Sequence, residues 1–508
     1  MPHSHDAAAS PGSPTPPGSS SATTTTGQTS ARQVEMNGIN VIAESERKGR
    51  PRDLFWPWFA ANVSVLAMSY GAWLLAFGIS VSQALLAGIV GIIASFLLVG
   101  FASLAGKRGS APTMILSRAT FGVRGNIVPT VVSYLILVGW EIVLVSLATL
   151  ATDTVLTRLG LDVGNGGKVL AFLIVVAIIM AAGVLGFDAI MKVQGYITWA
   201  TGLLTVVYVA LTWSHINWSA VSASQAGPAQ AVIGALVFAI TAFGLSWANS
   251  ASDYSRYLPR TASGTAVVWW TTFGASIAPI VLVIFGLLLA ASDPELSKAI
   301  GLDPIGALTT LLPTWFLVPF AVVAILGLIG GAVLDIYSSG LTLLAMGLRI
   351  PRWTAVVIDG VLMVLGTIYV VWIAPDFLGP FQGFLITLGV PLAVWVGCFL
   401  ADLLVRRQGY RDASLYDAGG RYGSWNLDTV VFMVLGTFLG WGLVTSSAPG
   451  FQWQGYLLGP LGLGGKEGAW AFANLGVLVA IAVGFVGYLI TCRRRVDWQE
   501  SLAEGDFR

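Results

Sequence analysis

The sequence predicts an all-α polytopic membrane protein with twelve transmembrane helices. The chain of 508 residues is 56% hydrophobic and only 10% charged, and its mean hydropathy of +0.79 lies far above the values of soluble domains. Long uncharged runs recur, each close to the roughly 20 residues that a helix needs to cross about 30 Å of hydrocarbon. The apolar–polar alternation of a membrane β-barrel is absent from the sequence.

Twelve apolar runs follow one another along the chain. They lie at 54–78, 82–105, 127–152, 169–187, 193–213, 231–252, 265–291, 315–347, 354–374, 380–404, 429–445 and 469–491. Residues 1–50 are rich in Ser, Thr, Pro and Gly and bury too little apolar surface to offset the entropy of ordering, so a disordered cytoplasmic tail is expected. This tail has no apolar stretch before a cleavage site, so the first run is expected to remain as a span.

The distribution of cationic residues predicts the orientation. An even number of spans puts both termini on one side of the membrane, and the positive-inside rule selects that side. Of the 26 Lys and Arg residues, only Arg158, Lys168, Lys298 and Lys466 fall on the side opposite the termini. Both termini, including a C-terminal tail at 493–508, are therefore expected to be cytoplasmic. The Ala-, Gly- and Val-rich composition favours a bacterial inner membrane as the cell membrane concerned.

Charge and motif content exclude several function classes. A formal net charge of +1 provides no basic field for nucleic acid. Cys398 and Cys492 show no pairing pattern and the three histidines form no cluster, so neither a metal site nor a cofactor is expected. The sequence carries no His-Glu-x-x-His or Gly-x-Ser-x-Gly motif, which disfavours an intramembrane enzyme, and no repeated filter loop, which disfavours a channel.

Small and polar residues interrupt the first and sixth runs. The first contains Asn62 and Ser64, followed by Ser-Tyr-Gly at 69–71, and the sixth contains Gly244 and Asn249. Such side chains compete for backbone hydrogen bonds and weaken a helix, and a broken helix exposes carbonyl and amide groups to a cation or polar solute. The same residues are also compatible with simple close packing of helices.

Two interrupted helices five spans apart predict a pair of inverted five-helix repeats with a binding site between them near the membrane midplane. The first repeat is expected at 51–213 and the second at 230–404. Two peripheral helices, with a preceding cytoplasmic loop, are expected at 405–492.

Two carboxylates are expected deep inside spans. Glu141 lies near the middle of the third run and Asp335 near the middle of the eighth, which are symmetry partners in an inverted repeat. An acid inside a membrane costs about 2.5–3.5 kcal/mol even on the lenient insertion scale, so it indicates a functional site, and proton binding and release is the chemistry it suits. The alternative is a protonated acid that joins two helices. Four other acids fall near the ends of runs and are expected to be interfacial and structural: Asp188, Asp253, Asp359 and Asp402.

Two aromatic residues are candidates for holding a flat ligand. Trp140 lies beside Glu141, and Phe243 lies inside the interruption of the sixth run. Together they could sandwich a flat heterocycle, each contributing stacking energy on the order of 1 kcal/mol. Simple packing is the alternative for either residue taken alone.

Several segments resemble a known family. They are WFAAN at 58–62, RATFGVRG at 118–125 followed by Pro129, GW at 139–140, SDYSRY at 252–257, DIYS at 335–338 and AD at 401–402 followed by RR at 406–407. Over roughly residues 50–425 the chain resembles the nucleobase-cation symporter-1 family of cytosine, purine, allantoin and hydantoin permeases. The resemblance implies a LeuT-type fold of 5+5 inverted repeats plus two peripheral helices, working by alternating access.

The resemblance also implies site residues. Backbone carbonyls that bind sodium in the family's structurally known hydantoin transporter match Ala60 and Val63, and a neighbouring substrate glutamine falls on Ser64. Its third-span stacking tryptophan matches Trp140, and a glutamine one turn later falls on Leu144. Its sixth-span stacking tryptophan aligns with Gly244, which leaves Phe243 as the substitute, and a substrate asparagine falls on Asp335.

Departures from the family pattern bear on the coupling ion and the substrate. The eighth-span positions that complete the sodium site read Leu326, Ile329 and Gly330, which offer no hydroxyl. This favours proton coupling, through Asp335 or Glu141, over sodium coupling. An acid in place of an amide also favours a base with a donor edge, such as cytosine or a purine. Allantoin, a hydantoin or a vitamin-like pyrimidine remains the alternative substrate.

The expected site thus comprises two overlapping sets of residues. The substrate candidates are Asn62, Ser64, Trp140, Glu141, Phe243, Gly244, Asn249 and Asp335, and the cation-coupling candidates are Glu141, Asp335, Ala60 and Val63. The expected partners are a flat nitrogenous heterocycle, a co-transported proton and the lipid bilayer.

Overall fold

The regular structure of the described chain is entirely helical. A computed structural model describes residues 38–161, 164–185, 187–348, 350–374 and 377–502, and within these ranges there is no β-strand. Most of the expected N-terminal tail and residues 503–508 of the expected C-terminal tail lie outside the described residues. The predicted all-α class is confirmed.

The first half of the chain opens with a broken span. After η1 (Glu44–Glu46), the helices η2 (Pro51–Leu54) and α1 (Phe55–Asn62) are separated by three residues from α2 (Leu66–Leu75), and the two parts are bent by 68°. The break coincides with the predicted interruption at Asn62 and Ser64, whereas residues 69–71 are helical and lie inside α2. The other elements are α3 (Val81–Gly109), α4 (Thr113–Leu116), α5 (Arg118–Phe121), α6 (Ile127–Arg158), α7 (Gly164–Leu185) and α8 (Phe187–Thr212).

The second half repeats the pattern of a broken span followed by long helices. The α-helix α10 (Ala229–Ala242) ends at Phe243, and the chain continues as the 3₁₀ helix η4 (Gly244–Ser250) and then α11 (Ala251–Ser255). The break predicted in the sixth run is therefore present. The linking elements are η3 (Trp213–His215) and α9 (Trp218–Ser222), and the remaining ones are α12 (Gly264–Ser292), α13 (Pro294–Leu302), α14 (Gly306–Thr309), α15 (Thr314–Ala345), α16 (Arg352–Ile368), the π-helical turn η5 (Tyr369–Ile373) and α17 (Leu378–Val405).

The C-terminal part adds two apolar helices and a short, mostly polar one. Its elements are η6 (Ala413–Leu415), α18 (Leu427–Gly442), η7 (Gly465–Glu467), η8 (Ala471–Ala473), α19 (Gly476–Thr491) and α20 (Arg493–Ser501). The last span was expected from residue 469, but its helix begins at Gly476. Asn474 adopts a left-handed backbone conformation with φ 50°, which ends the preceding turn and prevents a continuous helix through this point.

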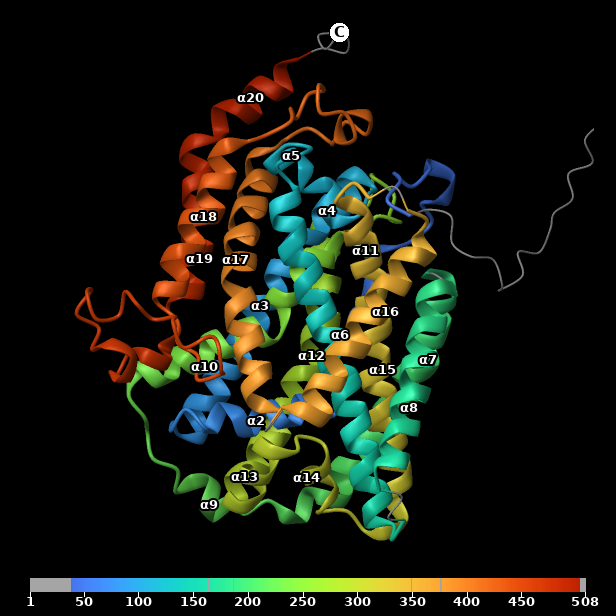
Figure 1. Cartoon of the computed structure of the whole chain (residues 1–508), viewed down its shortest axis with the longest axis vertical. Helices are drawn as coiled ribbons and strands as arrows, with labels where there is room; N and C mark the ends of the chain where they lie inside the picture. Colours follow the sequence, from blue (N-terminus) through green and yellow to red (C-terminus); the bar gives the residue numbers. More distant parts are fainter. Residues whose placement is uncertain (1–37, 162–163, 186, 349, 375–376, 503–508) are drawn as a thin grey trace, which may run out of the picture. The chain divides into compact units, whose positions relative to one another are not determined.

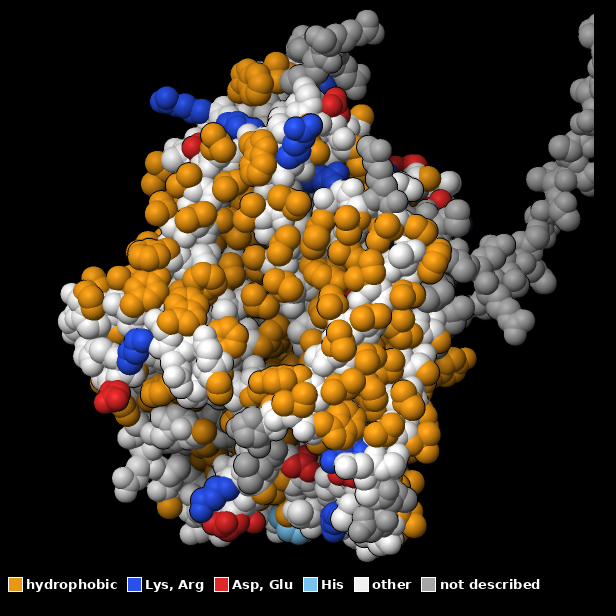
Figure 2. Space-filling view, viewed as in Figure 1, with side chains coloured by type: hydrophobic (Ala, Val, Ile, Leu, Met, Phe, Trp, Pro, Cys, Tyr) orange, Lys and Arg blue, Asp and Glu red, His pale blue; other side chains and the backbone are white. Residues whose placement is uncertain are grey.

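The helices are long and apolar enough for a membrane. Among the described residues, nine helices qualify as spans, two bent pairs qualify when each is joined, and α18 is a shorter apolar helix. These elements are compatible with the twelve expected spans. On the face drawn in Figure 2, hydrophobic side chains cover the middle of the molecule and charged side chains gather toward its two ends.

The arrangement places the two broken spans in the centre (Figure 1). Helices α18 and α19 lie on one side against α17, and α7 and α8 lie on the other. Helices α4, α5 and α20 lie at the end that also holds residues 38–50, and α9, α13 and α14 lie at the opposite end. The central pairs that pack most extensively are α6 with α15, α3 with α12, and α2 with α12.

Helices α2 and α12 meet backbone to backbone through two glycines. A Cβ on Gly286 would collide with the carbonyl group of Met68, and one on Gly71 would collide with the backbone of Leu287. Backbone atoms cannot yield as a flexible side chain can, so even one methyl group forces the helices apart.

Gly286→Ala is therefore expected to lower stability by about 1–3 kcal/mol or more, the usual effect of overpacking. The measurement is the thermal midpoint of the detergent-solubilised protein by fluorescence-detected size exclusion. Gly202→Ala on α8 is the matched control, because a Cβ there meets nothing within 4 Å. Equal midpoints for the two variants would contradict the close packing of α2 and α12.

Candidate functional site

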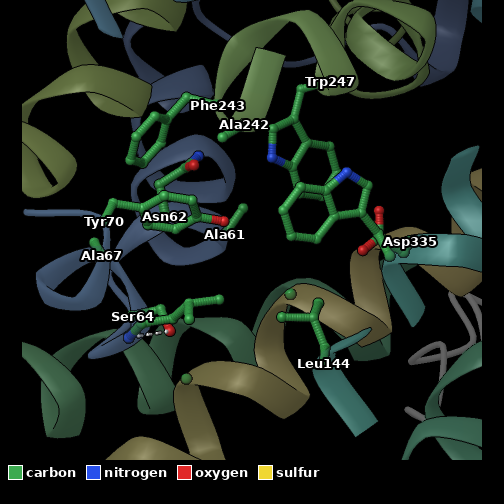
Figure 3. Close-up of a pocket in the computed structure, with 14 residues that line it drawn as sticks. Ala61, Asn62, Ser64, Ala67, Tyr70, Leu144, Ala242, Phe243, Trp247 and Asp335 are labelled. Atoms are coloured by element: carbon green, nitrogen blue, oxygen red, sulfur yellow. Dashed lines mark hydrogen bonds between the residues drawn. The ribbon is translucent and has the colours of Figure 1, made fainter. Parts of the chain in front are cut away.

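A cavity lies between the two broken spans. It has about 510 Å³ of empty space, part of which is continuous with solvent. It is lined by α1, α2 and their junction, by α6, by the break between α10 and η4, and by α15. The lining residues are Ala61, Asn62, Ser64, Leu66, Ala67, Tyr70, Trp140, Leu144, Ala242, Phe243, Trp247, Gly327, Gly331 and Asp335. In Figure 3, Asn62 and Tyr70 lie on the opposite side of this space from Asp335.

The break between α1 and α2 shapes one wall. Val63 leaves the helical conformation with φ −81° and ψ 69°, and the Asn62 side chain donates a hydrogen bond of 2.8 Å to the carbonyl of Trp58. The Ser64 hydroxyl accepts from the amide of Leu66 at 3.3 Å, which holds the start of α2 (Figure 3). A helix end leaves the carbonyls of its last turn without intrahelical donors. The last turn of α1 therefore has carbonyl groups without intrahelical donors beside this wall, and their binding of a cation stays a prediction.

The second break contributes Phe243 but not Gly244. Phe243 has φ −106° and ψ −107°, and its ring lies against that of Tyr70 with centroids 4.7 Å apart. The Gly244 amide donates to the Ser95 hydroxyl at 3.0 Å, and a Cβ at Gly244 would collide with the backbone of α3. Gly244 is thus a packing contact between η4 and α3 and does not line the cavity.

Aromatic rings close the cavity in two directions. Toward α12 and α17, Tyr70 and Trp73 are 3% and 4% exposed, and Trp73 packs on Phe381 at 5.5 Å. In the other direction, the Trp58 ring contacts Trp247 edge-on at 5.7 Å. Trp58 also meets Tyr254 at 5.2 Å and is itself 1% exposed. These two groups of aromatic contacts are called here the aromatic seals of the cavity.

Trp140 lines the cavity from α6. Its indole meets the rings of Phe381 and Phe384 edge-on, at 5.6 and 6.2 Å. Its ring N–H has no hydrogen-bond partner among the described residues. These edge contacts leave it able to stack on a flat ligand.

Asp335 brings the only carboxylate among the lining residues. Its side chain is 1% exposed, and its Oδ2 atom has no hydrogen-bond partner within the described chain. A buried acceptor without a donor is costly, so a ligand N–H that reached this atom would bind with corresponding strength. The structure therefore places Asp335 where a donor-bearing ligand can meet it.

Two further substrate candidates, besides Gly244, lie outside the cavity. Asn249 is fully buried, and its amide group donates to the Ser133 hydroxyl at 2.8 Å, which ties η4 to α6. Glu141 is also fully buried, and its Oε1 atom lies 2.7 Å from the hydroxyl of Ser339 on α15. Neither side chain lines the cavity.

The expected cation-binding carbonyls lie beside a glycine-rich stretch of α15. A Cβ built on Gly327 would lie 3.4 Å from the carbonyl oxygen of Val63, and one on Gly331 would lie 3.9 Å from that of Ala61. Ala60 belongs to the same last turn of α1 and is 2% exposed. The α15 residues that face these carbonyls here, Gly327 and Gly331, have no side-chain oxygen.

Sequence reasoning missed two aromatic lining residues. Tyr70 was treated as part of a helix interruption, and Trp247 was passed over in favour of Phe243. Their signal is weak because aromatic residues are frequent in membrane spans, and only the fold shows which of them face inward. Figure 3 shows Trp247 between Phe243 and Asp335 over the cavity.

Comparisons with known proteins agree with this geometry. A family model described as permease for cytosine/purines, uracil, thiamine, allantoin matches residues 41–459. The putative purine-cytosine permease YxlA of Bacillus subtilis (strain 168) is 26% identical over 484 residues, which cover 93% of this chain and 99% of YxlA.

Two solved structures show the fold. Mhp1, a nucleobase-cation-symport-1 family transporter in a closed conformation with bromovinylhydantoin bound, superposes with a TM-score of 0.69 at 18% identity, covering 93% of this chain and 98% of Mhp1. A Na⁺-coupled sialic acid symporter in its substrate-bound outward-open state gives 0.59 at 14% identity, covering 90% and 92%. The expected LeuT-type architecture is confirmed.

Proposed function

This chain belongs to the family of permeases for cytosine/purines, uracil, thiamine and allantoin, and from that premise we propose that it imports a nucleobase, cytosine or a purine, by proton symport. It is a multi-span membrane transporter and not an enzyme. The observation that carries the substrate proposal is the cavity, where a buried carboxylate oxygen of Asp335, without a hydrogen-bond partner among the described residues, lies among aromatic rings.

The chemistry of the cavity supports a flat base with N–H donors. Trp140, Phe243 and Trp247 offer faces or edges to a ring, and Asp335 accepts from a ring N–H or an exocyclic amino group. Asn62 and Ser64 lie on the wall opposite Asp335 and can contact the other edge of the base. Cytosine and the amino purines present such a donor edge.

Alternating access fits the two aromatic seals. In alternating access the cavity opens toward one side of the membrane at a time. The breaks in the two broken spans can act as hinges about which the aromatic seals move. Opening past Trp58 and Tyr254 would release the ligand toward the end that holds residues 38–50, and opening past Tyr70 and Trp73 would admit it from the other.

Proton coupling is favoured over sodium coupling by the α15 residues beside the first break. Leu326, Ile329 and Gly330 bring no hydroxyl to the carbonyls of Ala60 and Val63, and a sodium site requires several oxygen ligands. The acids Asp335 and Glu141 remain as the groups able to carry a proton.

The proposed setting is a bacterial inner membrane with both termini in the cytoplasm. Helices α4, α5 and α20, which carry Arg118 and the arginines at 493–495, lie at the same end as residues 38–50 (Figure 1). That concentration of positive charge at one end supports the orientation.

Uptake into proteoliposomes tests the function. We expect saturable, uphill accumulation of an amino-bearing base, driven by a proton gradient alone, from a labelled panel of cytosine, adenine, guanine, hypoxanthine, uracil, allantoin and a hydantoin. Each is assayed with a proton gradient alone and with a sodium gradient alone. Accumulation driven only by sodium would overturn the coupling. Uptake restricted to allantoin or a hydantoin, or of no panel member, would shift the substrate to those compounds or to a vitamin-like pyrimidine.

A further inference from the structure

Three helices bring two carboxyl groups onto one hydroxyl, outside the cavity. The Ser339 hydroxyl on α15 lies 2.7 Å from Oε1 of Glu141 on α6 and 2.8 Å from Oδ2 of Asp359 on α16. All three side chains are fully buried. The sequence suggested that Asp359 is interfacial and structural, but the fold places it against Glu141.

The hydrogen count of this cluster requires a proton. A serine hydroxyl has one hydrogen and can donate to only one of the two carboxyl oxygens. The second short contact becomes a hydrogen bond only if the other carboxyl group is protonated and donates to the serine oxygen. With both acids ionised, two negative charges would lie close together in a buried site. One of the two short contacts between the serine oxygen and a carboxylate oxygen would then have no hydrogen between them. The observed geometry therefore fits one shared proton.

A neighbouring tyrosine points to the same conclusion. Tyr134 on α6 is 7% exposed, and its hydroxyl lies close enough to Asp359 to interact with it. Oε2 of Glu141 and Oδ1 of Asp359 have no hydrogen-bond partner in the geometry of the described chain. The Tyr134 hydroxyl is thus a buried donor, and the carboxyl oxygens of Glu141 and Asp359 are buried acceptors. Which of them pair depends on which carboxyl group holds the proton.

Among the described residues, no cation pairs with the cluster. The other titratable groups that act on it are Tyr134 from α6 and Asp335 from α15. On α7, which packs against α6, α15 and α16, the titratable side chain of the described stretch 164–183 is Lys168, and it pairs with Asp153 at 3.0 Å. Among the described residues neither Glu141 nor Asp359 forms an ion pair. Only a proton is left to balance their charge.

The cluster also has a direction. Tyr134 and Asp359 each lie seven residues from the starts of α6 and α16, at the end where the carbonyl of Ala345 meets Arg118 of α5. Glu141 lies seven residues deeper than Tyr134, about 10 Å along the helix. Asp335 lies one turn from Ser339 on α15, so the series leads from that end toward the cavity wall.

We propose that Glu141, Ser339 and Asp359 form the proton-binding site of the transport cycle, separate from the substrate cavity and coupled to it through α15. This deepens the proposed function and rests on it. When the shared proton leaves, the repulsion between the two carboxylates pushes α6 and α16 apart at Ser339. Because α6 and α15 also carry Trp140 and Asp335, this movement changes the cavity.

The test compares two transport measurements on the same purified protein in proteoliposomes. Exchange of labelled against unlabelled substrate without any gradient reports the substrate site, and uphill accumulation under an imposed proton gradient reports coupling. For Glu141→Gln and Asp359→Asn we expect exchange within about threefold of the unaltered protein and an accumulation ratio that falls to about one. Asp428→Asn, which removes an exposed acid at the start of α18, is expected to leave both unchanged.

The outcomes separate the two proposals. If the unaltered protein is not driven by protons, the proposed coupling fails. If it is driven by protons and both variants still accumulate substrate, the proton site is wrong and the function stands. Should both variants fold poorly, the infrared spectrum of the unaltered protein tests the proposal instead. We expect the carbonyl band of a protonated carboxylic acid at neutral pH, and the absence of that band overturns the proposal.

Ser339→Ala keeps both acids and removes the hydroxyl group between them. It is expected to shift the pH of half-maximal uptake, and an unshifted pH profile counts against the role of this hydroxyl.

Discussion

Trp140→Ala is expected to abolish saturable uptake while the protein remains in the membrane at normal abundance. Stacking of a base on an aromatic side chain contributes about 1–3 kcal/mol when measured by alanine substitution, which corresponds to roughly a 5–150-fold loss of affinity. The Trp140 indole contacts Phe381 and Phe384 edge-on, so its removal enlarges the cavity and takes away the aromatic face that α6 offers to a ligand. The measurement is the KM for the transported base, with membrane abundance determined in parallel.

Two further variants identify the cause. Trp140→Phe keeps an aromatic face and is expected to restore much of the affinity, which a purely space-filling role would not require. Trp315→Ala removes an indole that is 66% exposed at the start of α15 and is expected to leave KM unchanged. An unaltered KM in Trp140→Ala would remove this residue from the site and make Trp247, which lines the same cavity, the stacking candidate.

The spans and both breaks could be predicted from sequence because each is a local property. Apolar runs report burial in lipid, and the residues around Asn62 and Phe243 weaken a helix wherever it lies. Ser-Tyr-Gly at 69–71 was predicted to interrupt the helix as well, yet Gly71 serves a close contact between α2 and α12. A glycine or serine that permits close helix packing cannot be distinguished, from the sequence alone, from one that breaks a helix.

The partners of the buried acids could not be predicted. Glu141 and Asp335 were identified by their depth in two runs, and the fold brings α6 and α15 together. Asp359 lies seven residues from the start of α16 and was therefore assigned to the interface. Depth along one helix does not report what covers that helix from the side, and it is α6 and α15 that bury Asp359. Asp402, by contrast, accepts hydrogen bonds from Arg406 at 2.8 and 3.0 Å and has the structural role expected of it.

Asp335→Asn is expected to raise the KM for an amino-bearing base by about 10–100-fold. Leaving a buried hydrogen-bonding group without its partner costs about 1–3 kcal/mol, and asparagine keeps the size of the side chain while replacing one carboxyl oxygen by an NH₂ group. The NH₂ group of the asparagine side chain can also face the amino group of the base, and two donors cannot form a hydrogen bond. The loss of affinity should therefore be larger for cytosine or adenine than for a ring without an amino group. The measurement is the KM in gradient-free exchange for each base, with Asp428→Asn as the control for loss of an acid elsewhere.

The same variant shows which acid carries the proton. If the proton resides on Glu141 and Asp359, the Asp335→Asn protein should still accumulate its substrate uphill once the external concentration exceeds the raised KM, because the coupling site is intact. An unchanged KM together with a lost accumulation ratio would instead make Asp335 the proton carrier and limit Glu141 to a structural contact with Ser339. Loss of both would mean that Asp335 serves the substrate and the proton together.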